Sequence, residues 1–427
     1  MKYRYPALLV AAALALTGCT ADPKPVSQPA SNALDGVGPI TFVTGKDSSG
    51  VQQGLLDKWN TEHPDQKVTL VELPAQADGQ RQQLIQNAQT KSSSYGVVSL
   101  DVVWTAEFAA NGWVEELPQS EFPLGQILPS LVAGVKYFDK MYAAPWGGGT
   151  ALLYYRSDLL TKAGVQPPKT WAELDAACAK VLKLPEAKGV DCYGGQFNKY
   201  EGLTVNASEA INSAGGSVVG PDGKPTLNTP EAKEGLNFLV DGFKSGRIPK
   251  AAITWDEEAG RRAFQEGKLL FLRNWSYVYT LANKTDGSSK VAGKFGVAPI
   301  PGLKGPGKGT IGSNNLAISK YAKNKKTALD FIKWMTSQQT AKQLMVQSAQ
   351  SPAYTAMYDD PDLVKQYAFM PMLKEGLMNA APRPAVIKYG DATAAIQEEV
   401  SSALTGQKTS EQALSDLQQR LSGIVGK

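Results

Sequence analysis

The sequence predicts an α/β protein built from two domains. Segments with the patterns of strands and of helices alternate from residue 40 onward, and several strand-like segments are apolar throughout. Continuous apolar runs are typical of parallel strands that helices cover on both faces. A chain of 427 residues is also longer than one hydrophobic core usually supports, so two domains are expected.

Composition argues against two broad classes of protein. Apolar residues make up 42% and charged residues 20%, as in globular proteins in solution, and no run of about 20 apolar residues could span a bilayer. The formal net charge is +4, or +2 without Lys2 and Arg4. This balance provides no electrostatic footprint for nucleic acid. We therefore expect neither an integral membrane protein nor a nucleic-acid-binding protein.

The first residues carry the features of an export signal. Lys2 and Arg4 precede an apolar stretch, Ala7 to Leu16, and small residues follow it. Leu16-Thr17-Gly18-Cys19 resembles the lipobox of bacterial lipoproteins, whose cysteine is acylated and begins the mature protein; a chance cysteine after an apolar run is the alternative. We expect a signal peptide over 1–18 and lipidation of Cys19, which would anchor the protein at the extracellular face of the cell membrane.

Residues 19–38 predict a tether between this anchor and the folded protein. Pro23, Pro25 and Pro29 stand among Ser, Ala, Asp and Lys, without any hydrophobic periodicity. Such composition is typical of disordered linkers.

A first α/β set follows the tether. Apolar residues recur at helical spacing between strand-like segments, as Leu55, Leu56 and Trp59 do before the break at His63-Pro64. In order, the sequence predicts a strand over 40–44, a helix ending at His63, a strand over 68–73, a helix over 80–90 and a strand over 99–104.

A second α/β set begins after three successive glycines, Gly147 to Gly149, which predict a passage of the backbone between domains. Thr170 and Glu173 form a capping box, and Thr229-Pro230 supplies an N-cap with proline at N1. In order, the sequence predicts a helix over 170–182, a helix from 230, strands over 269–272, 295–301 and 310–319, and mainly helices from 325 onward.

The stretch Ala263 to Tyr279 combines a helix end, a short apolar strand over 269–272 and an aromatic cluster. Trp275, Tyr277 and Tyr279 follow directly after the strand. Open α/β sheets bind ligands beyond the carboxyl ends of their strands, which favours a binding site here. Aromatic side chains also dominate cores, so a purely structural role for these residues is the alternative.

Cys178 and Cys192 remain after the predicted lipidation site. An even pair in an exported protein favours a disulfide, which across so short a loop would contribute about 3 kcal/mol. Two buried thiols are the alternative.

Several kinds of chemistry are not expected. The single histidine, His63, precedes a proline at a helix end, so His-dependent nucleophilic catalysis and a zinc site of the usual type are implausible. The glycine-rich segment over 302–309 lacks the Ser or Thr that follows the lysine of a phosphate-binding loop. No catalytic residue, metal ligand or cofactor is predicted.

Carboxylate pairs leave a glycosidase open as an alternative, because that chemistry needs only two suitably spaced acids. Asp101 with Glu107, or Asp256, Glu257 and Glu258, could provide them. The second group is also typical of a helix N-terminus, where acids favour the dipole. Asp101 interrupts an apolar strand, so it lies either at the end of the strand or against a ligand.

Six segments are similar to family 1 extracellular solute-binding proteins of ABC importers, and most similar to the trehalose/maltose-binding branch. They cover nearly the whole mature chain in order. These are SLDVVWTAEFAANGWVEEL (Ser99–Leu117), YAAPWGGGTALLYYRSDLL (Tyr142–Leu160), YEGLTVNASEAINSAGG (Tyr200–Gly216), AFQEGKLLFLRNW (Ala263–Trp275), TIGSNNLAIS (Thr310–Ser319) and APRPAVIKY (Ala381–Tyr389).

The resemblance implies a periplasmic-binding-protein-like fold with two α/β lobes, three hinge crossings and a ligand cleft between the lobes. It assigns 39–148 and 299–333 to the N-terminal lobe, and 149–298 and 334–427 to the C-terminal lobe. It also implies a monomer that captures an α-glucoside, namely trehalose, maltose or a maltooligosaccharide, and delivers it to the membrane subunits of an ABC permease without catalysis. An exported glycosidase and a surface adhesin are the alternatives.

The resemblance also implies the residues that contact the sugar. The four positions that match best are Asp101, Arg81, Trp275 and Arg383, of which Trp275 would pack on the apolar face of a sugar ring. Further candidates are Glu201, Asp47 and Ser48.

Three positions depart from the family pattern: Gly147 and Gly149 stand where an aromatic or polar side chain is expected, and Asn314 stands where one relative carries tryptophan. Trp146 is expected to fill part of the resulting gap. We therefore expect a roomier site that could hold an oligosaccharide or a modified α-glucoside as readily as trehalose.

Overall fold

The structure, a computed structural model, describes residues 34–384 and 386–425. The predicted signal peptide and Cys19 lie outside these residues, as does the predicted tether up to residue 33. Among the described residues, no helix combines the length and the apolar character needed to cross a membrane.

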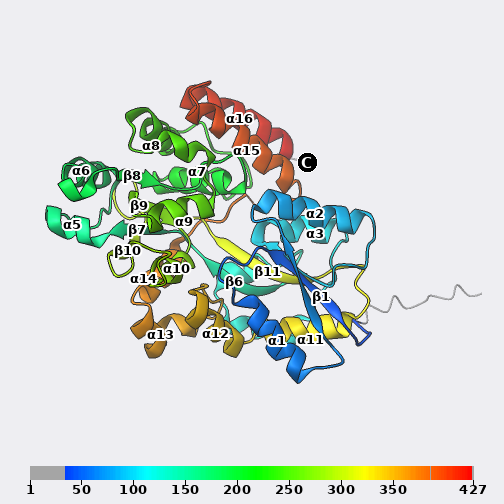
Figure 1. Cartoon of the computed structure of the whole chain (residues 1–427). Coiled ribbons are helices and arrows are strands. Elements are labelled where there is room, and N and C mark those ends of the chain that lie inside the picture. The colour runs from blue at the N-terminus through cyan, green and yellow to red at the C-terminus, as the bar shows by residue number, and fades with distance from the viewer. Residues whose placement is uncertain (1–33, 385, 426–427) are drawn as a thin grey trace, which may run out of the picture. The chain divides into compact units, whose positions relative to one another are not determined.

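The first lobe is built on a five-stranded sheet with the order β2-β1-β3-β11-β6 (Figure 1). β1 pairs in parallel with β2 and β3, whereas β11 runs antiparallel to β3 and β6. Phe42, Leu100 and Leu316 are fully buried in its core. The strands are β1 (Ile40–Gly45), β2 (Val68–Leu73), β3 (Val97–Asp101), β6 (Ala144–Gly149) and β11 (Gly312–Ile318), and the helices are α1 (Gln52–Glu62), α2 (Ala77–Gln89), α3 (Thr105–Ala110) and α11 (Lys325–Met335).

The second lobe is built on a four-stranded sheet with the order β10-β7-β9-β8. Its strands are β7 (Leu152–Arg156), β8 (Asp191–Gly194), β9 (Leu269–Asn274) and β10 (Phe295–Pro299). Side chains alternate between two hydrophobic clusters, because successive residues of a strand point to opposite faces. Leu152 and Tyr154 belong to one cluster, and Leu153 belongs to the other.

Helices cover both faces of this second sheet (Figure 1). The helices of this lobe are α5 (Ser157–Ala163), α6 (Trp171–Val181), α7 (Glu201–Ser213), α8 (Pro230–Ser245), α9 (Glu257–Gln265), α10 (Val278–Ala282), α12 (Gln338–Ser348), α13 (Pro361–Gln366), α14 (Met370–Asn379), α15 (Tyr389–Leu404) and α16 (Ser410–Val425). A short α4 (Pro129–Ala133) and a two-stranded ribbon of β4 (Lys136–Tyr137) and β5 (Lys140–Met141) complete the fold. The predicted caps of α6 and α8 are present: Thr170 and Glu173 make a capping box, and Thr229 accepts from the helix backbone.

Two local predictions were wrong. The strand predicted over 99–104 ends at Asp101, and Val102–Trp104 form a 3-10 turn whose Val103 N–H donates to Asp101 Oδ1 over 3.4 Å. The sheets are also mixed, since β11 and β7 pair antiparallel with their neighbours. Apolar runs reported the burial of these strands correctly, but they carry no information on strand direction.

The chain passes between the sheets at several points. β6 belongs to the first sheet and β7 to the second, with Thr150 and Ala151 between them. The return passage runs from β10 to β11. After α11, which packs on β11, the buried residues of α12 join a cluster of the second lobe. Each lobe is therefore assembled from separate parts of the sequence.

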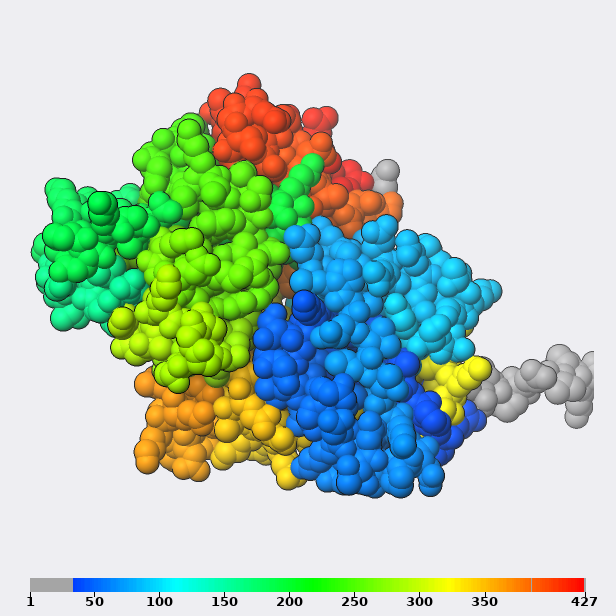
Figure 2. All heavy atoms as spheres, in the orientation of Figure 1, coloured from blue at the N-terminus to red at the C-terminus, as the bar shows by residue number. Residues whose placement is uncertain are grey.

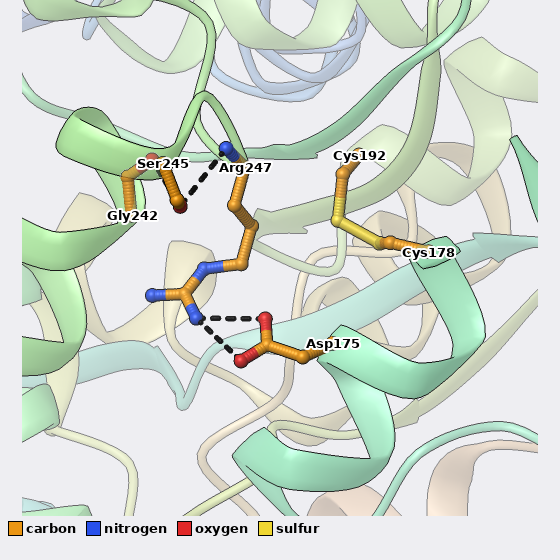
Figure 3. The surroundings of a disulfide bond; sticks show 6 residues. All are labelled: Asp175, Cys178, Cys192, Gly242, Ser245 and Arg247. Carbon is orange, nitrogen blue, oxygen red and sulfur yellow. Dashed lines mark hydrogen bonds and ion pairs between the residues drawn. A yellow bond between two sulfur atoms is a disulfide. The ribbon is translucent and has the colours of Figure 1, made fainter.

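A disulfide between Cys178 and Cys192 joins α6 to β8 in the second lobe (Figure 3). The two Cα atoms lie 5.5 Å apart, and both residues are buried in the hydrophobic cluster of that lobe. Beside them, Arg247 donates to both carboxylate oxygens of Asp175, over 2.8 and 3.1 Å. Helix α6 is thus fastened to the rest of the lobe on the side that carries these residues.

Candidate ligand-binding cleft

A cavity of about 370 Å³ lies between the lobes. The first lobe contributes residues that follow β1 and end β3, with parts of β6 and β11. The second lobe contributes the starts of α7 and α9 and the residues after β9. Figure 2 shows the blue residues of the first lobe and the green residues of the second meeting along a crevice. A volume of this size is typical of small-molecule sites.

Strand order explains why the first lobe opens at this position. The chain leaves β1 for β2 on one side and then returns to β3 on the other side of β1. Ligands of open α/β sheets bind where the strand order reverses in this way, beyond the carboxyl ends of the strands. Asp47 and Ser48 follow β1, Asp101 ends β3, and all three line the cavity.

Trp275 follows β9 directly and lines the cavity from the second lobe. The Tyr154 hydroxyl donates to its carbonyl oxygen over 2.8 Å, and its own N–H donates to Asn274 Oδ1 over 2.8 Å. Its ring lies 4.4 Å from the Arg273 guanidinium and so close to Gly312 that a Cβ there would come within 2.8 Å. The side chain is half-buried, which leaves part of its surface for a ligand.

The arginine beside Trp275 is itself fully buried and paired. Arg273 donates to the two carboxylate oxygens of Glu209 over 2.8 and 2.9 Å, and to Gln196 Oε1 over 2.7 Å. A bidentate arginine–carboxylate pair fixes the guanidinium in one geometry. The pair therefore holds a cation against the indole, where the ring quadrupole attracts it.

Arg383 lines the cavity and connects the two lobes. One of its terminal nitrogens donates to Asp101 Oδ2 over 3.0 Å and to Glu201 Oε1 over 2.6 Å, and the other pairs with Asp101 Oδ1. Asp101 belongs to β3, and Glu201 begins α7. Glu201 also accepts from the Tyr389 hydroxyl and, over 2.7 Å, from Thr393. Both oxygens of Glu201 are thus occupied, and its role is to hold Arg383.

Burial and charge pairing act in opposite directions on the pKa values of Glu201 and Arg383. Burial raises the pKa of Glu201 to about 6, although Arg383 acts in the opposite direction. Burial alone would lower the pKa of Arg383, but Asp101 and the other neighbours hold it well above its ordinary value. Arg383 therefore stays charged, and Glu201 ionises at a higher pH than an exposed glutamate.

The second-lobe wall carries two pairs of a tyrosine with a glutamate. The Tyr200 hydroxyl donates to Glu257 Oε2 over 2.5 Å, and the Tyr277 hydroxyl donates to Glu258 Oε1 over 2.7 Å. Both glutamates lie in the first turn of α9, and Asp256 caps that helix. Burial raises the pKa of Glu257. The acids thus support the helix start, as their spacing predicted, and also line the cavity.

A strained turn after α12 closes one side of the cavity. Ala349 is fully buried and has φ 55°, a left-handed conformation that residues other than glycine rarely adopt. The Ser276 hydroxyl holds the turn by donating to the Ala349 carbonyl oxygen over 2.7 Å, and it lies 2.8 Å from the Ser351 hydroxyl. The turn thereby places Gln350 and Ser351 on the cavity wall.

This turn corrects the prediction that Gly147 and Gly149 make the site roomier. A Cβ at Gly147 would come within 2.9 Å of the Ser351 carbonyl oxygen and 3.0 Å of Gln350 Nε2. At Gly149 a Cβ would come within 3.1 Å of Ser351 Oγ. The segment after α12 occupies the space that larger side chains would need, so the glycines leave no gap in the wall.

The structure brings most of the predicted sugar-binding residues together. Asp47 carries a structural role that the sequence did not indicate: its carboxylate accepts from Ser49 N–H and Gln52 N–H, each over 2.8 Å, and so orders the start of α1. The cavity is lined by Asp47, Ser48, Asp101, Glu201, Trp275, Asn314 and Arg383 from the predicted set.

Arg81 and Trp146 lie elsewhere. Neither lines the main cavity, although the resemblance suggested both as contacts. Arg81 is engaged by Glu107, whose Oε2 accepts from its Nε over 2.9 Å, and it lies against Gly390 at the start of α15. Trp146 lines a second cavity, in the first lobe.

Sequence reasoning missed several residues of the wall. Tyr200 adjoins Glu201 in a segment already singled out, and Lys46 precedes Asp47, so proximity in sequence could have found both. Gln350 and Ser351 carry no such signal, because only the turn at Ala349 brings them to the cavity. Among the open alternatives, Tyr277 lines the cavity, whereas Tyr279 packs against Phe295, Tyr367 and Phe369 in the core.

The cavity offers hydrogen-bonding groups and an aromatic surface, with most of its carboxylates already engaged. Asp101 is bound by Arg383, and Glu257 and Glu258 accept from tyrosines. Within residues 34–384 and 386–425, there is no group of three or more His, Cys, Asp or Glu side chains that could hold a metal ion. This arrangement suits an uncharged ligand with many hydroxyl groups.

Comparison with known proteins agrees with this geometry. Residues 44–342 match the bacterial extracellular solute-binding protein family. A probable ABC transporter-binding protein of Deinococcus radiodurans is 35% identical over 372 residues, which cover 84% of this chain and 87% of that protein. A mannitol-binding protein of Pseudomonas aeruginosa is 26% identical over 310 residues, which cover 71% of this chain and 70% of that protein.

Among solved structures, maltose-bound MalE3 of T. maritima is similar to this chain with a TM-score of 0.85 and 34% identity, over 90% of this chain and 99% of that one. The family matches most of the chain, and the 35% identity to the relative from Deinococcus radiodurans extends over 87% of that protein, so both comparisons lead to the same conclusion. The chain belongs to the family of bacterial extracellular solute-binding proteins.

Proposed function

We propose that this protein captures an uncharged sugar outside the cell and delivers it to the permease subunits of an ABC importer. The expected class is an α-glucoside: trehalose, maltose or a maltooligosaccharide. The observation that carries the proposal is Trp275, a half-buried indole held beside Arg273 at the edge of a cavity between two lobes. The similarity of this chain to the maltose-bound protein from T. maritima supports the sugar class.

Capture would proceed by closure of the lobes around the ligand. The three crossings that the predicted lobe ranges imply, near Gly148, Pro299 and Trp334, would act as hinges, because short connections between rigid lobes absorb such motion. A ligand that contacts both walls favours the closed state by its additional affinity for that state. Asp101 would present its carboxylate to sugar hydroxyls from the first lobe, and Trp275 would cover the C–H face of a ring from the second.

The competing glycosidase requires one protonated acid and one free carboxylate beside the bond that is cleaved. Asp101 and Glu107 are both ion-paired, with Arg383 and Arg81. These pairs favour binding over acid–base chemistry. We further propose that lipidated Cys19 anchors a monomer at the extracellular face of the membrane, which incorporation of labelled lipid into wild-type and Cys19→Ala protein would test.

Isothermal titration with trehalose, maltose, maltotriose and mannitol tests the sugar class. We expect saturable binding of at least one α-glucoside, and recovery of unchanged sugar after long incubation with the protein. Release of glucose would establish the glycosidase instead. Binding of mannitol alone would move the protein to the polyol-binding members of the family, as with its relative from Pseudomonas aeruginosa.

A further inference from the structure

A second cavity of about 240 Å³, here called the inner cavity, adjoins the cleft on the side of the first lobe. The two cavities are adjacent, because they share half of the lining of the smaller one: Lys46, Gln52, Ala77, Asp101, Asn314 and Gln350. Except for Gln350, its lining comes entirely from the first lobe. The lining residues not shared with the main cavity are Thr44, Gly45, Gln80, Ser99, Trp104 and Trp146.

The position of this inner cavity follows from the sheet. Thr44 and Gly45 end β1, and Ser99 lies two residues before the end of β3. These two strands flank the point at which the strand order reverses, where open α/β sheets leave room for ligands. Gly45 leaves room for the Gln80 side chain of α2, whose amide group a Cβ at this position would meet. Strands β1 and β3 and helix α2 of the first lobe therefore form much of the wall of this cavity.

Trp146 gives the inner cavity an unused hydrogen-bond donor. Its side chain is 3% exposed, and the Phe42 ring packs at an angle to it with the centroids 5.6 Å apart. Its Nε1–H has no hydrogen-bond partner among the described residues. The same holds for Gln52 Oε1, an acceptor that also lines this cavity. Buried polar atoms are nearly always paired in native proteins, so these two indicate a partner from outside the chain.

The charges and hydrogen-bonding groups of the lining residues limit which kind of chemical group can occupy this cavity. Lys46 and Asp101 carry opposite charges, which disfavours an anion or a cation as the occupant. Ser99 and Thr44 add hydroxyl groups that can both donate and accept. A group with several neutral hydroxyls can satisfy the tryptophan donor and the glutamine acceptor at once.

We propose that the inner cavity is a subsite for a hydroxyl-rich end of the ligand, while Trp275 covers a second ring in the outer cleft. This proposal rests on the sugar-binding function and extends it to ligand size. A ligand that reaches both cavities is preferred, so a disaccharide binds more tightly than glucose. Because one lobe supplies nearly the whole subsite, it exists before the lobes close.

The test compares Trp146→Phe with a matched control, Trp113→Phe. Both changes remove an indole N–H from the first lobe, but Trp113 lines neither cavity. Isothermal titration with maltose, trehalose and glucose should show affinity for the preferred disaccharide that is about tenfold weaker in Trp146→Phe and unchanged in the control. In the wild-type protein, the affinity for glucose should be well below the affinity for the preferred disaccharide.

A second variant guards against a folding defect in Trp146→Phe. Ser99→Val adds volume inside the cavity with a residue suited to a strand, so it should fold and still weaken disaccharide binding at least tenfold. Wild-type affinity in both Trp146→Phe and Ser99→Val, with the disaccharide still bound, would overturn the subsite but leave the sugar function intact. Absence of any sugar binding by the wild type would remove both proposals.

Discussion

Replacement of Trp275 by alanine separates its binding role from its structural role. The peptide groups around it are held independently of the indole, by the Tyr154 hydroxyl at 2.8 Å and by Asn274 Oδ1 at 2.8 Å. The backbone after β9 should therefore keep its course in Trp275→Ala. What disappears is the aromatic surface toward the cavity and the contact with Arg273.

The two losses have different sizes. A sugar ring covered by the indole buries apolar surface worth about 1.5–3 kcal/mol, so binding should weaken roughly 10- to 150-fold. The contact between Arg273 and the ring, at 4.4 Å, contributes about 0.5–2 kcal/mol to the stability of the unliganded protein. Since Arg273 keeps its bonds to Glu209, its charge is not left unpaired. The melting temperature should fall by only a few degrees.

Titration calorimetry and thermal unfolding of the same preparations measure both quantities. Trp255→Ala is a suitable control, because Trp255 is also a half-buried tryptophan of the second lobe and lines neither cavity. It should lose stability without losing sugar affinity. Trp275→Phe should recover part of the affinity, since it restores a smaller aromatic face.

One result would refute this reasoning: a large fall in melting temperature for Trp275→Ala with unchanged affinity in the protein that remains folded. Trp275 would then belong to the core, and the binding surface would have to be sought on Tyr200 or Tyr277, the other aromatic residues of the second-lobe wall.

Three further outcomes follow from charges and cross-links. Glu209→Gln leaves the buried Arg273 without its carboxylate and should cost about 3–5 kcal/mol in urea unfolding, and an unchanged midpoint would contradict the assigned pair. A double alanine variant of Cys178 and Cys192 should lose about 3 kcal/mol, because they close a loop with a sequence separation of 14, and equal melting with and without the bridge would argue against it. Glu201, with a pKa raised from 4.5 to about 6, stabilises the fold most below pH 4.5 and loses about 2 kcal/mol of that contribution as pH rises to 6. Unfolding of Glu201→Gln should lack this loss, so the stability of the wild type relative to the variant should fall across that window; a constant difference would refute the shift.

The sequence predicted the presence of helices and strands more reliably than the direction in which the strands pair. The strand over 269–272 and the capping box at Thr170 were recognisable because burial and local hydrogen bonding leave a signature in neighbouring residues. Strand direction leaves none, so the antiparallel β11 was not anticipated. The end of β3 depended on one carboxylate: Asp101 stops the strand by accepting from the turn that follows.

The residues of the cleft show the same distinction, since the sequence could predict some of them and not others. Trp275 could be inferred because it adjoins a buried strand, and Asp101 because it interrupts one. The wall at Gln350 and Ser351 could not, since it depends on a left-handed turn that brings distant residues beside Gly147. The same contact made the reasoning about a roomier site fail, because a missing side chain was replaced from elsewhere in the chain.

If both proposals hold, the division of the two cavities between the lobes would give Trp146 and Trp275 different tasks. A contact made within one lobe stabilises the ligand equally whether the lobes are open or closed, and so raises affinity without favouring closure. Trp146 would make a contact of this kind, because the proposed subsite is lined almost wholly by the first lobe. Trp275 would reach the ligand from the opposite lobe, so its interaction would be gained only when the cleft closes. Small-angle scattering of sugar-saturated variants should therefore show full compaction in Trp146→Phe and incomplete compaction in Trp275→Ala, and equal compaction in the two would mean that closure depends on other contacts between the lobes, such as those of Arg383.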